Sequence, residues 1–358
     1  MKKFLFLMAA FVVAVSAKAQ KIEVVDSDGD GVPYASVLNA NGEFLGITSL
    51  EGVLADANGA KSVTISHVAF KPKEVALDGK DVRVTLEDAD YSLNEIVISP
   101  KPLAYVQTYY RVFFYDSKHG IIYYRAGLTD NALDRETGKL KASTKHFSTG
   151  FKGIITKVIN MALGWGFDMR SNIRTGRIED RLVEKNKVSQ MKITQTSPGH
   201  WRVSDYKGTV GTITDDKQTG RRLFSIDSRM ISRHRLEAKG KTKKLAKREK
   251  HDKNTENEVK SEALIYQIDE DGNYSPEDFV MEQFNDTFDY EFNEEMLHCI
   301  VGYQLFSTDR AYVTKKELKE RQKANEMKMT YENIRQFEKQ NNIPPLAPVI
   351  EQALGKLK

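Results

Sequence analysis

The sequence predicts a mainly β protein: an N-terminal antiparallel β-sandwich, a larger curved antiparallel β-sheet domain with one inserted helix, and a helical C-terminal tail. Two runs near the N-terminus, residues 62–66 and 82–86, alternate apolar and polar side chains with the period of a half-buried strand. Asn-Gly and Asp-Gly pairs, as at 41–42 and 271–272, separate such runs and are typical of tight turns. Beyond residue 314 the pattern becomes helical.

Residues 1–19 have the pattern of a cleavable secretory signal. Lys2 and Lys3 precede an apolar run at 4–15, and Ala17 and Ala19 are the small residues before Gln20. This run is shorter than the roughly 20 residues that a membrane-spanning helix needs. No Cys follows it, so a lipid anchor at the new N-terminus is not expected. We therefore expect an exported chain, in the periplasm or on the periplasm-facing surface of the outer membrane, and not lipidated.

Residues 20–98 form the predicted sandwich. The segments 31–37 (GVPYASV), 46–52 (GITSLEG), 65–70 (ISHVAF) and 93–98 (LNEIVI) follow one another in an order that resembles the carboxypeptidase-regulatory-like domain. The resemblance covers about a fifth of the chain. It implies a transthyretin-like β-sandwich of the kind found in cell-envelope proteins of the Bacteroidetes, with a structural or binding role.

A stiff Pro-containing linker at 99–104 leads to the second β domain, residues 105–313. Strand-like stretches recur at 121–129, 188–196, 200–214, 221–231, 262–268, 279–292 and 300–313, and an amphipathic helix is expected at 153–163. The Lys-rich run 239–260 has few apolar positions and is interpreted as a mobile loop or hairpin tip. The tail, residues 314–358, begins with a capping-box pattern at 314–317 and ends in a short helix at 349–357.

Charge and cysteine content exclude some classes of function. The chain carries 54 Lys and Arg against 50 Asp and Glu, a net charge of +4, and loss of residues 1–19 with their three lysines leaves +1. Such a small excess does not indicate a nucleic-acid partner. The single Cys299 cannot form an intramolecular disulfide and lies in an apolar run, so we expect a buried, unreactive thiol.

Two short motifs suggest metal sites, but neither is complete. Asp26-x-Asp28-x-Asp30 opens like a calcium-binding loop, yet the twelfth position is Val37 and not the bidentate Glu that the loop needs. His234-x-x-Glu237 has the spacing of two zinc ligands in carboxypeptidases, and His298 would be the remaining candidate. No nucleophile elbow, phosphate loop or dinucleotide motif is present. We therefore expect no metal, no cofactor and no catalytic residue.

Two groups of residues are candidates for binding. Aromatic side chains on a curved sheet can line an apolar cavity or stack on sugar rings, although burial in the core would also account for them; they are Tyr109, Phe113, Tyr115, Tyr123 and Trp165. Basic side chains of the Lys-rich run could contact an anionic surface, although a solvated loop would look the same; they are Lys241, Lys243, Lys244, Lys247 and Arg248.

The sequence thus predicts a non-enzymatic cell-envelope protein that acts as a binding or structural adapter for an envelope protein or an outer-membrane complex. One alternative is a periplasmic carrier that holds lipid or another apolar ligand in a half-barrel, with a glycan as a further ligand class. A zinc carboxypeptidase-like hydrolase ranks last. An outer-membrane barrel is not expected, because the strands lack the regular ten-residue alternation and aromatic girdles of that class.

Overall fold

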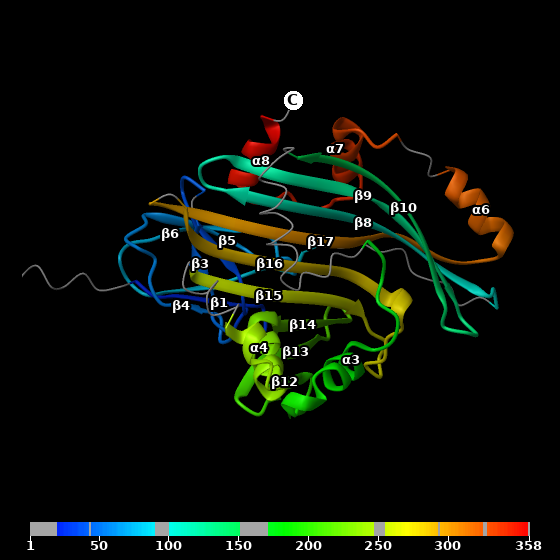
Figure 1. The fold of residues 1–358 in the computed structure, drawn as a ribbon, viewed down its shortest axis with the longest axis horizontal. Helices are drawn as coiled ribbons and strands as arrows, with labels where there is room; N and C mark the ends of the chain where they lie inside the picture. The colour runs from blue at the N-terminus through cyan, green and yellow to red at the C-terminus, as the bar shows by residue number, and fades with distance from the viewer. Residues whose placement is uncertain are drawn as a thin grey trace, which may run out of the picture. The chain divides into compact units, whose positions relative to one another are not determined.

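The computed structural model describes residues 20–42, 44–89, 100–150, 171–246, 255–292, 294–324 and 328–356. They form two compact units, Met1–Ala89 and Asp90–Lys358. The predicted signal at 1–19, the predicted helix at 153–163 and the segment 93–98 lie outside the described residues. The prediction of a mainly β fold is confirmed, since strands are the dominant element of both units (Figure 1).

Unit 1 consists of two small sheets with the strand orders β4-β1-β7 and β3-β2-β5-β6. The strands are β1 (Ile22–Val25), β2 (Ser36–Asn39), β3 (Phe44–Ile47), β4 (Val53–Leu54), β5 (Ser62–Ser66), β6 (Lys73–Ala76) and β7 (Val82–Thr85). Alternate residues of both sheets are fully buried, among them Ile22, Val24, Val37 and Ile65, so each sheet has one apolar face.

One feature of unit 1 differs from the expected antiparallel sandwich: β1 and β7 are parallel, with Val24 opposite Val84. A parallel pair needs a crossover connection between its strands. Here the chain between β1 and β7 forms the other five strands of the unit, which gives it room to return in the same direction.

Unit 2 is built on one ten-stranded antiparallel sheet with the order β10-β9-β8-β17-β16-β15-β14-β13-β12-β11. The strands are β8 (Leu103–Asp116), β9 (Gly120–Asp134), β10 (Leu140–Gly150), β11 (Lys192–Ser197), β12 (His200–Asp205), β13 (Gly208–Asp216), β14 (Arg221–Asp227), β15 (Thr255–Gln267), β16 (Phe279–Phe292) and β17 (Glu295–Val313).

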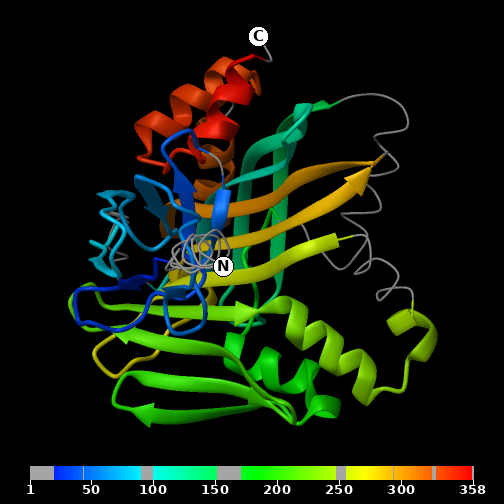
Figure 2. The ribbon, with the colours of Figure 1, turned by 90° about the vertical axis from the view of Figure 1, so that its left-hand side faces the viewer.

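The sheet is strongly curved, as predicted: β8–β10 and β12–β14 run in clearly different directions (Figure 2). Side chains alternate between the two faces. On the face that we call inner, Val106, Tyr110 and Val112 of β8 belong to the same apolar core as Val203 of β12 and Phe224 of β14. Strands far apart in the sheet order therefore share one core, which requires the sheet to curl around it. The opposite face, called outer, carries Tyr109 and Arg111.

Three predictions for the middle of unit 2 need correction. The run 221–231 is not one strand, because β14 ends at Asp227 and α4 (Ser228–Ala238) follows; the Asp227 carboxylate caps this helix by accepting from Met230 N at 2.7 Å. Helix α3 (Ile178–Lys185) and the short 3-10 turn η1 (Lys187–Ser189) precede β11, where a strand was expected from 188. The run 239–260 is not one loop, because 242–246 is helical and β15 begins at Thr255.

The predicted helical tail consists of α6 (Lys315–Ala324), α7 (Tyr331–Gln340) and α8 (Pro348–Gly355). The capping box is confirmed: Thr314 N donates to Glu317 Oε2 at 2.7 Å, and Glu317 N donates to Thr314 Oγ1 at 3.3 Å. The last helix starts and ends slightly earlier than expected, because Pro348 occupies a first-turn position, where its missing N–H costs nothing. Among the described helices, none has the length and apolarity needed to cross a membrane.

Candidate functional site

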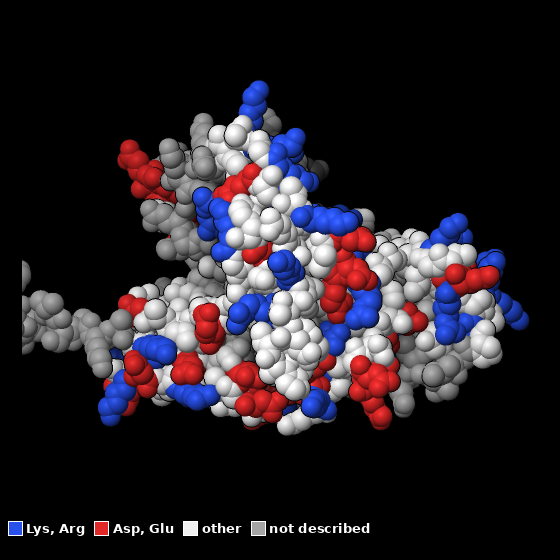
Figure 3. All heavy atoms as spheres, turned by 90° about the horizontal axis from the view of Figure 1, so that it is seen from below, with Lys and Arg blue, Asp and Glu red and all other residues white. Residues whose placement is uncertain are grey.

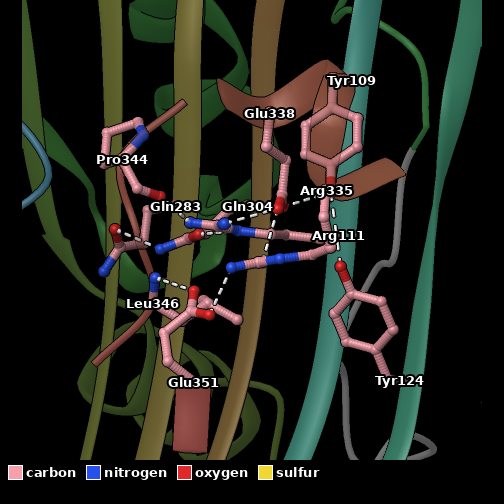
Figure 4. Close-up of polar contacts among 10 residues, drawn as sticks. All are labelled: Tyr109, Arg111, Tyr124, Gln283, Gln304, Arg335, Glu338, Pro344, Leu346 and Glu351. Carbon is pink, nitrogen blue, oxygen red and sulfur yellow. Dashed lines mark hydrogen bonds and ion pairs between the residues drawn. The ribbon is translucent and has the colours of Figure 1, made fainter. Parts of the chain in front are cut away.

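Arg111 is the only cation in the aromatic strand β8, whose one other charged residue is the terminal Asp116, and the Arg111 side chain is fully buried. It points from the outer face toward α7 and the segment before α8 (Figure 4). Its guanidinium donates from Nε to Gln304 Oε1 at 2.6 Å, from Nη1 to Glu338 Oε1 at 2.9 Å and from Nη2 to the Pro344 carbonyl at 2.6 Å. Three different elements therefore meet at one cation.

Glu338 of α7 extends this contact into a network. Besides Arg111, it accepts from the Tyr109 hydroxyl at 2.6 Å and from Arg335 Nη1 at 2.5 Å. Arg335 also pairs with Glu351 of α8. We call this set the helix-docking network; its members are Tyr109, Arg111, Tyr124, Gln283, Gln304, Arg335, Glu338, Pro344, Leu346 and Glu351. It joins α7, α8 and their connection to four neighbouring strands of the sheet.

The chemistry of the helix-docking network is that of an anchor. Its two guanidinium groups face two carboxylates, so the buried charges balance, and charge-assisted hydrogen bonds of this kind are stronger than neutral ones. Burial raises the pKa of both the Tyr109 and the Tyr124 hydroxyl well above the usual value, so each stays a neutral donor at physiological pH. The arrangement holds the two helices on the sheet.

A second buried network lies on the inner face. Arg174, from the segment before α3, pairs with Glu262 of β15 and with Glu282 of β16, to which its Nε donates at 3.0 Å. Burial alone would lower the pKa of Arg174, but the two carboxylates raise it well above the usual value, so the guanidinium stays charged. Beside it, Lys260 and Asp286 form an ion pair of 2.6 Å. Each of these three carboxylates therefore faces a cation of the same unit.

The residues of the zinc-like motif have other partners. His234 is buried on α4, and its Nδ1 lies 2.6 Å from Asp205 Oδ2. Glu237 pairs with Lys207 and, at 3.3 Å, with Arg233, and it accepts from the Tyr206 hydroxyl. The side-chain hydrogen bond from Lys207 is the main reason why the pKa of Glu237 is lowered. Among the described residues, no group of His, Cys, Asp and Glu side chains is arranged to hold a metal ion.

The calcium-like run is an Asx turn. Asp26 Oδ1 accepts from the backbone N–H of Asp28 at 3.0 Å and of Asp30 at 2.9 Å, which is the hydrogen-bond pattern of such a turn. Burial raises the pKa of this carboxyl. The geometry is that of a turn between β1 and the following segment.

The predicted aromatic residues do not form one group. Tyr109 and Phe113 lie on the outer face and are buried, with 1% and 3% of their surface exposed. The ring of Tyr109 contacts the ring of Phe337 in α7, and the ring of Phe113 lies against Gly302 of β17. Tyr115 is also buried, near the end of β8. Tyr123 packs against the inner core. Trp165 lies outside the described residues.

Of the predicted basic residues, Lys241, Lys243 and Lys244 are exposed, at and just after the C-terminal end of α4. Lys247 and Arg248 lie outside the described residues. Lys243 and Lys244 therefore lie on the short helical segment 242–246, and Lys241 directly precedes it, where a loop was expected.

Burial shifts the pKa of two further groups, the Cys299 thiol and the His67 imidazole, away from neutral pH. Burial raises the pKa of the Cys299 thiol to about 12, so almost no thiolate is present at neutral pH. Burial lowers the pKa of His67 in unit 1 to about 4, and its Nδ1 accepts from Ala69 N.

Neither Arg111 nor Arg174, the cations at the centre of the two networks, is among the residues that the sequence predicts to be functional. A signal for Arg111 was present, because a lone charge inside the apolar run 103–115 must find a buried partner when both faces of a sheet are covered. Its partner Glu338 lies 227 positions later, so the pairing itself leaves no local trace.

Comparisons with known proteins do not assign the chain to a family. No family model and no curated protein matches it. Among solved structures, it is similar to a CurJ dehydratase at 10% identity, over 59% of this chain and 76% of that chain, with a TM-score of 0.10. It is also similar to the acyl-CoA thioesterase II TesB2 from Mycobacterium marinum at 9% identity, over 59% and 82% of the two chains, with a TM-score of 0.11. TM-scores this low do not indicate a shared fold.

Proposed function

We propose that this chain is an exported, non-enzymatic cell-envelope protein that works as a binding or structural adapter. The pairing of its interior charges is the observation that carries the proposal. The buried carboxylates of Glu338, Glu282 and Asp286 each face a cation of the same chain. Such closed networks fix one packing arrangement, whereas acid-base catalysis needs a group whose proton can be lost or gained near neutral pH.

The first part of the proposal rests on the pattern of residues 1–19 and on the resemblance of unit 1 to carboxypeptidase-regulatory-like domains. A partner in the cell envelope, either a single protein or an outer-membrane complex, is the class that this combination favours. The mass of the protein isolated from the producing cell tests export directly: a chain that begins at Gln20 is expected. Full-length protein recovered from the cytosol with Met1 intact would contradict it.

The adapter role is tested by site-specific crosslinking of the full chain in intact cells. A photo-crosslinking residue at Glu74, exposed on the edge strand β6 of unit 1, should give one discrete adduct with an envelope protein. The same residue placed at Glu320, exposed on α6 of unit 2, is the matched control for general surface collisions. Identical adduct patterns from both positions would argue against a specific partner for unit 1.

The second candidate is a carrier for lipid or another apolar ligand. The curl of the sheet favours it, because the aromatic residues Tyr110, Tyr266 and Tyr303 belong to one core on the inner side. Mass spectrometry of solvent extracts from purified protein separates the two functions: one lipid per chain would favour the carrier.

The third candidate, a zinc hydrolase, requires that the protein binds zinc and that His234→Ala abolishes this binding. A metal-free wild-type protein would exclude that function.

A further inference from the structure

Exposed apolar side chains gather at one end of unit 2. Among the described residues, four large hydrophobic side chains are markedly exposed, and three of them, Val188 (40%), Tyr206 (44%) and Met230 (37%), belong to η1, to the turn after β12 and to α4. Tyr206 links these elements, since its N–H donates to Ser189 O at 3.1 Å and its ring contacts His234, one turn after Met230. The three side chains thus share one surface.

The same end is strongly basic. Residues 228–246, which form α4 and the helical turn after it, contain seven Lys and Arg and one acidic residue, Glu237. Glu237 pairs with Arg233 of this run and with Lys207, and seven cations against one carboxylate leave a net charge of +6 on the run. Lys and Arg side chains are the main charged groups on the end that projects upward in Figure 3, which is the end formed by α4 and the turn after it.

Burial on α4 shows which way the charges point. Ile231 and His234 are buried against unit 2, whereas Arg233 is exposed and Arg229 is one turn away from it on the same side of the helix. Lys239, Lys241, Lys243 and Lys244 continue as exposed residues beyond the helix. We call this set the α4 surface; its members are Val188, Tyr206, Arg229, Met230, Arg233, Lys239, Lys241, Lys243 and Lys244.

We propose that the α4 surface docks on an anionic lipid bilayer. Lysines and arginines near such a bilayer are attracted to its negative surface potential, and amphipathic side chains such as Tyr and Met enter the headgroup region beside them. A nucleic acid fits less well, because the whole chain carries a net charge of only +4 and the α4 surface, at one end, has no row of stacking aromatics. The proposal is independent of the adapter role, since it concerns a surface that exists with or without a partner for unit 1.

Vesicle flotation with the full chain without residues 1–19 tests the proposal. The protein should float with vesicles of phosphatidylglycerol and phosphatidylcholine, should stay behind with pure phosphatidylcholine, and should be released when salt rises from 0.05 to 0.5 M, as screening predicts. In Lys241→Gln/Lys243→Gln/Lys244→Gln the partition coefficient should fall on the order of a hundredfold, since each cation near the surface contributes roughly fivefold. Met230→Gln should lower it severalfold without changing the salt dependence.

The matched control is Lys315→Gln/Lys316→Gln/Lys319→Gln on α6, which removes the same charge from another helix of unit 2. It should bind almost as well as the unaltered chain, and far-ultraviolet circular dichroism should show that all variants are folded. Equal losses in the two triple variants would overturn the proposal in favour of general electrostatic attraction. Failure of the unaltered chain to bind anionic vesicles would also overturn it and would leave an acidic protein as the partner of this surface. Neither failure affects the crosslinking test of the adapter role.

Discussion

Removing the charge of Glu338 tests whether the helix-docking network holds the C-terminal helices on the sheet. In Glu338→Gln the size is kept, but the fully buried Arg111 loses the carboxylate 2.9 Å away. Breaking a buried pair from one side costs about 3–5 kcal/mol, because the remaining charge stays desolvated. The Arg335 contact adds little, because Arg335 is partly exposed and keeps Glu351. We therefore expect the free energy of unfolding to fall by about 3 kcal/mol, the lower end of this range.

Urea unfolding followed by tryptophan fluorescence measures this loss in unit 2 alone, because both tryptophans, Trp165 and Trp201, lie between residues 90 and 358. With a slope of about 3 kcal/mol per M, the midpoint should fall by about 1 M. Glu332→Gln, an exposed carboxylate on the same helix, is the matched control and should shift it little.

The pairwise nature of the effect is checked by a double-mutant cycle. Arg111→Met combined with Glu338→Leu removes both charges, so the double variant should be more stable than the sum of the single losses predicts, by about 2 kcal/mol. Additive losses, or a loss below about 1 kcal/mol in Glu338→Gln, would refute the interpretation that the buried ion pair anchors α7.

Three further predictions concern other buried groups. The pKa of His67 is about 4 in the folded chain against 6.5 in the unfolded chain, so the unfolded state binds the proton more readily. The free energy of unfolding of unit 1, measured by hydrogen exchange of its amides, should therefore fall by about 3 kcal/mol as the pH falls from 6.5 to 4. His67→Gln should remove this pH dependence, and a dependence that persists in this variant would show that burial of the imidazole is not its cause. Gly302→Ala would place a methyl group 2.0 Å from the Phe113 ring and should lower the free energy of unfolding by about 1–3 kcal/mol, measured by urea unfolding. In the control Gly355→Ala the methyl group meets nothing within 4 Å, so the free energy of unfolding should not change. A larger loss at Gly355 than at Gly302 would contradict this packing. Cys299, with a thiol pKa of about 12, should resist iodoacetamide at pH 8 until the protein is unfolded, and rapid labelling of the native protein would show that the thiol is accessible.

The mainly β class and the capped start of the tail follow from the residues alone. These features depend on local signals: the alternation at 62–66, the Asp-Gly and Asn-Gly turns, and the spacing of Thr314 and Glu317. The error at 221–231 also has a local cause, because Ile231 continues an apolar pattern that a strand and a helix can share, and only the Asp227 cap decides between them.

Which charges meet, in contrast, depends on the tertiary fold. Arg111 and Glu338 are 227 residues apart, and Arg174 lies 108 residues from Glu282, so neither pair follows from spacing. The parallel pairing of β1 with β7 likewise depends on where the chain returns after five intervening strands. Local patterns fix which face of an element is buried, whereas the curl of the sheet and the docking of the tail fix what lies opposite that face. Buried polar contacts, and the binding surfaces next to them, depend on what lies opposite the buried face, which no local pattern specifies.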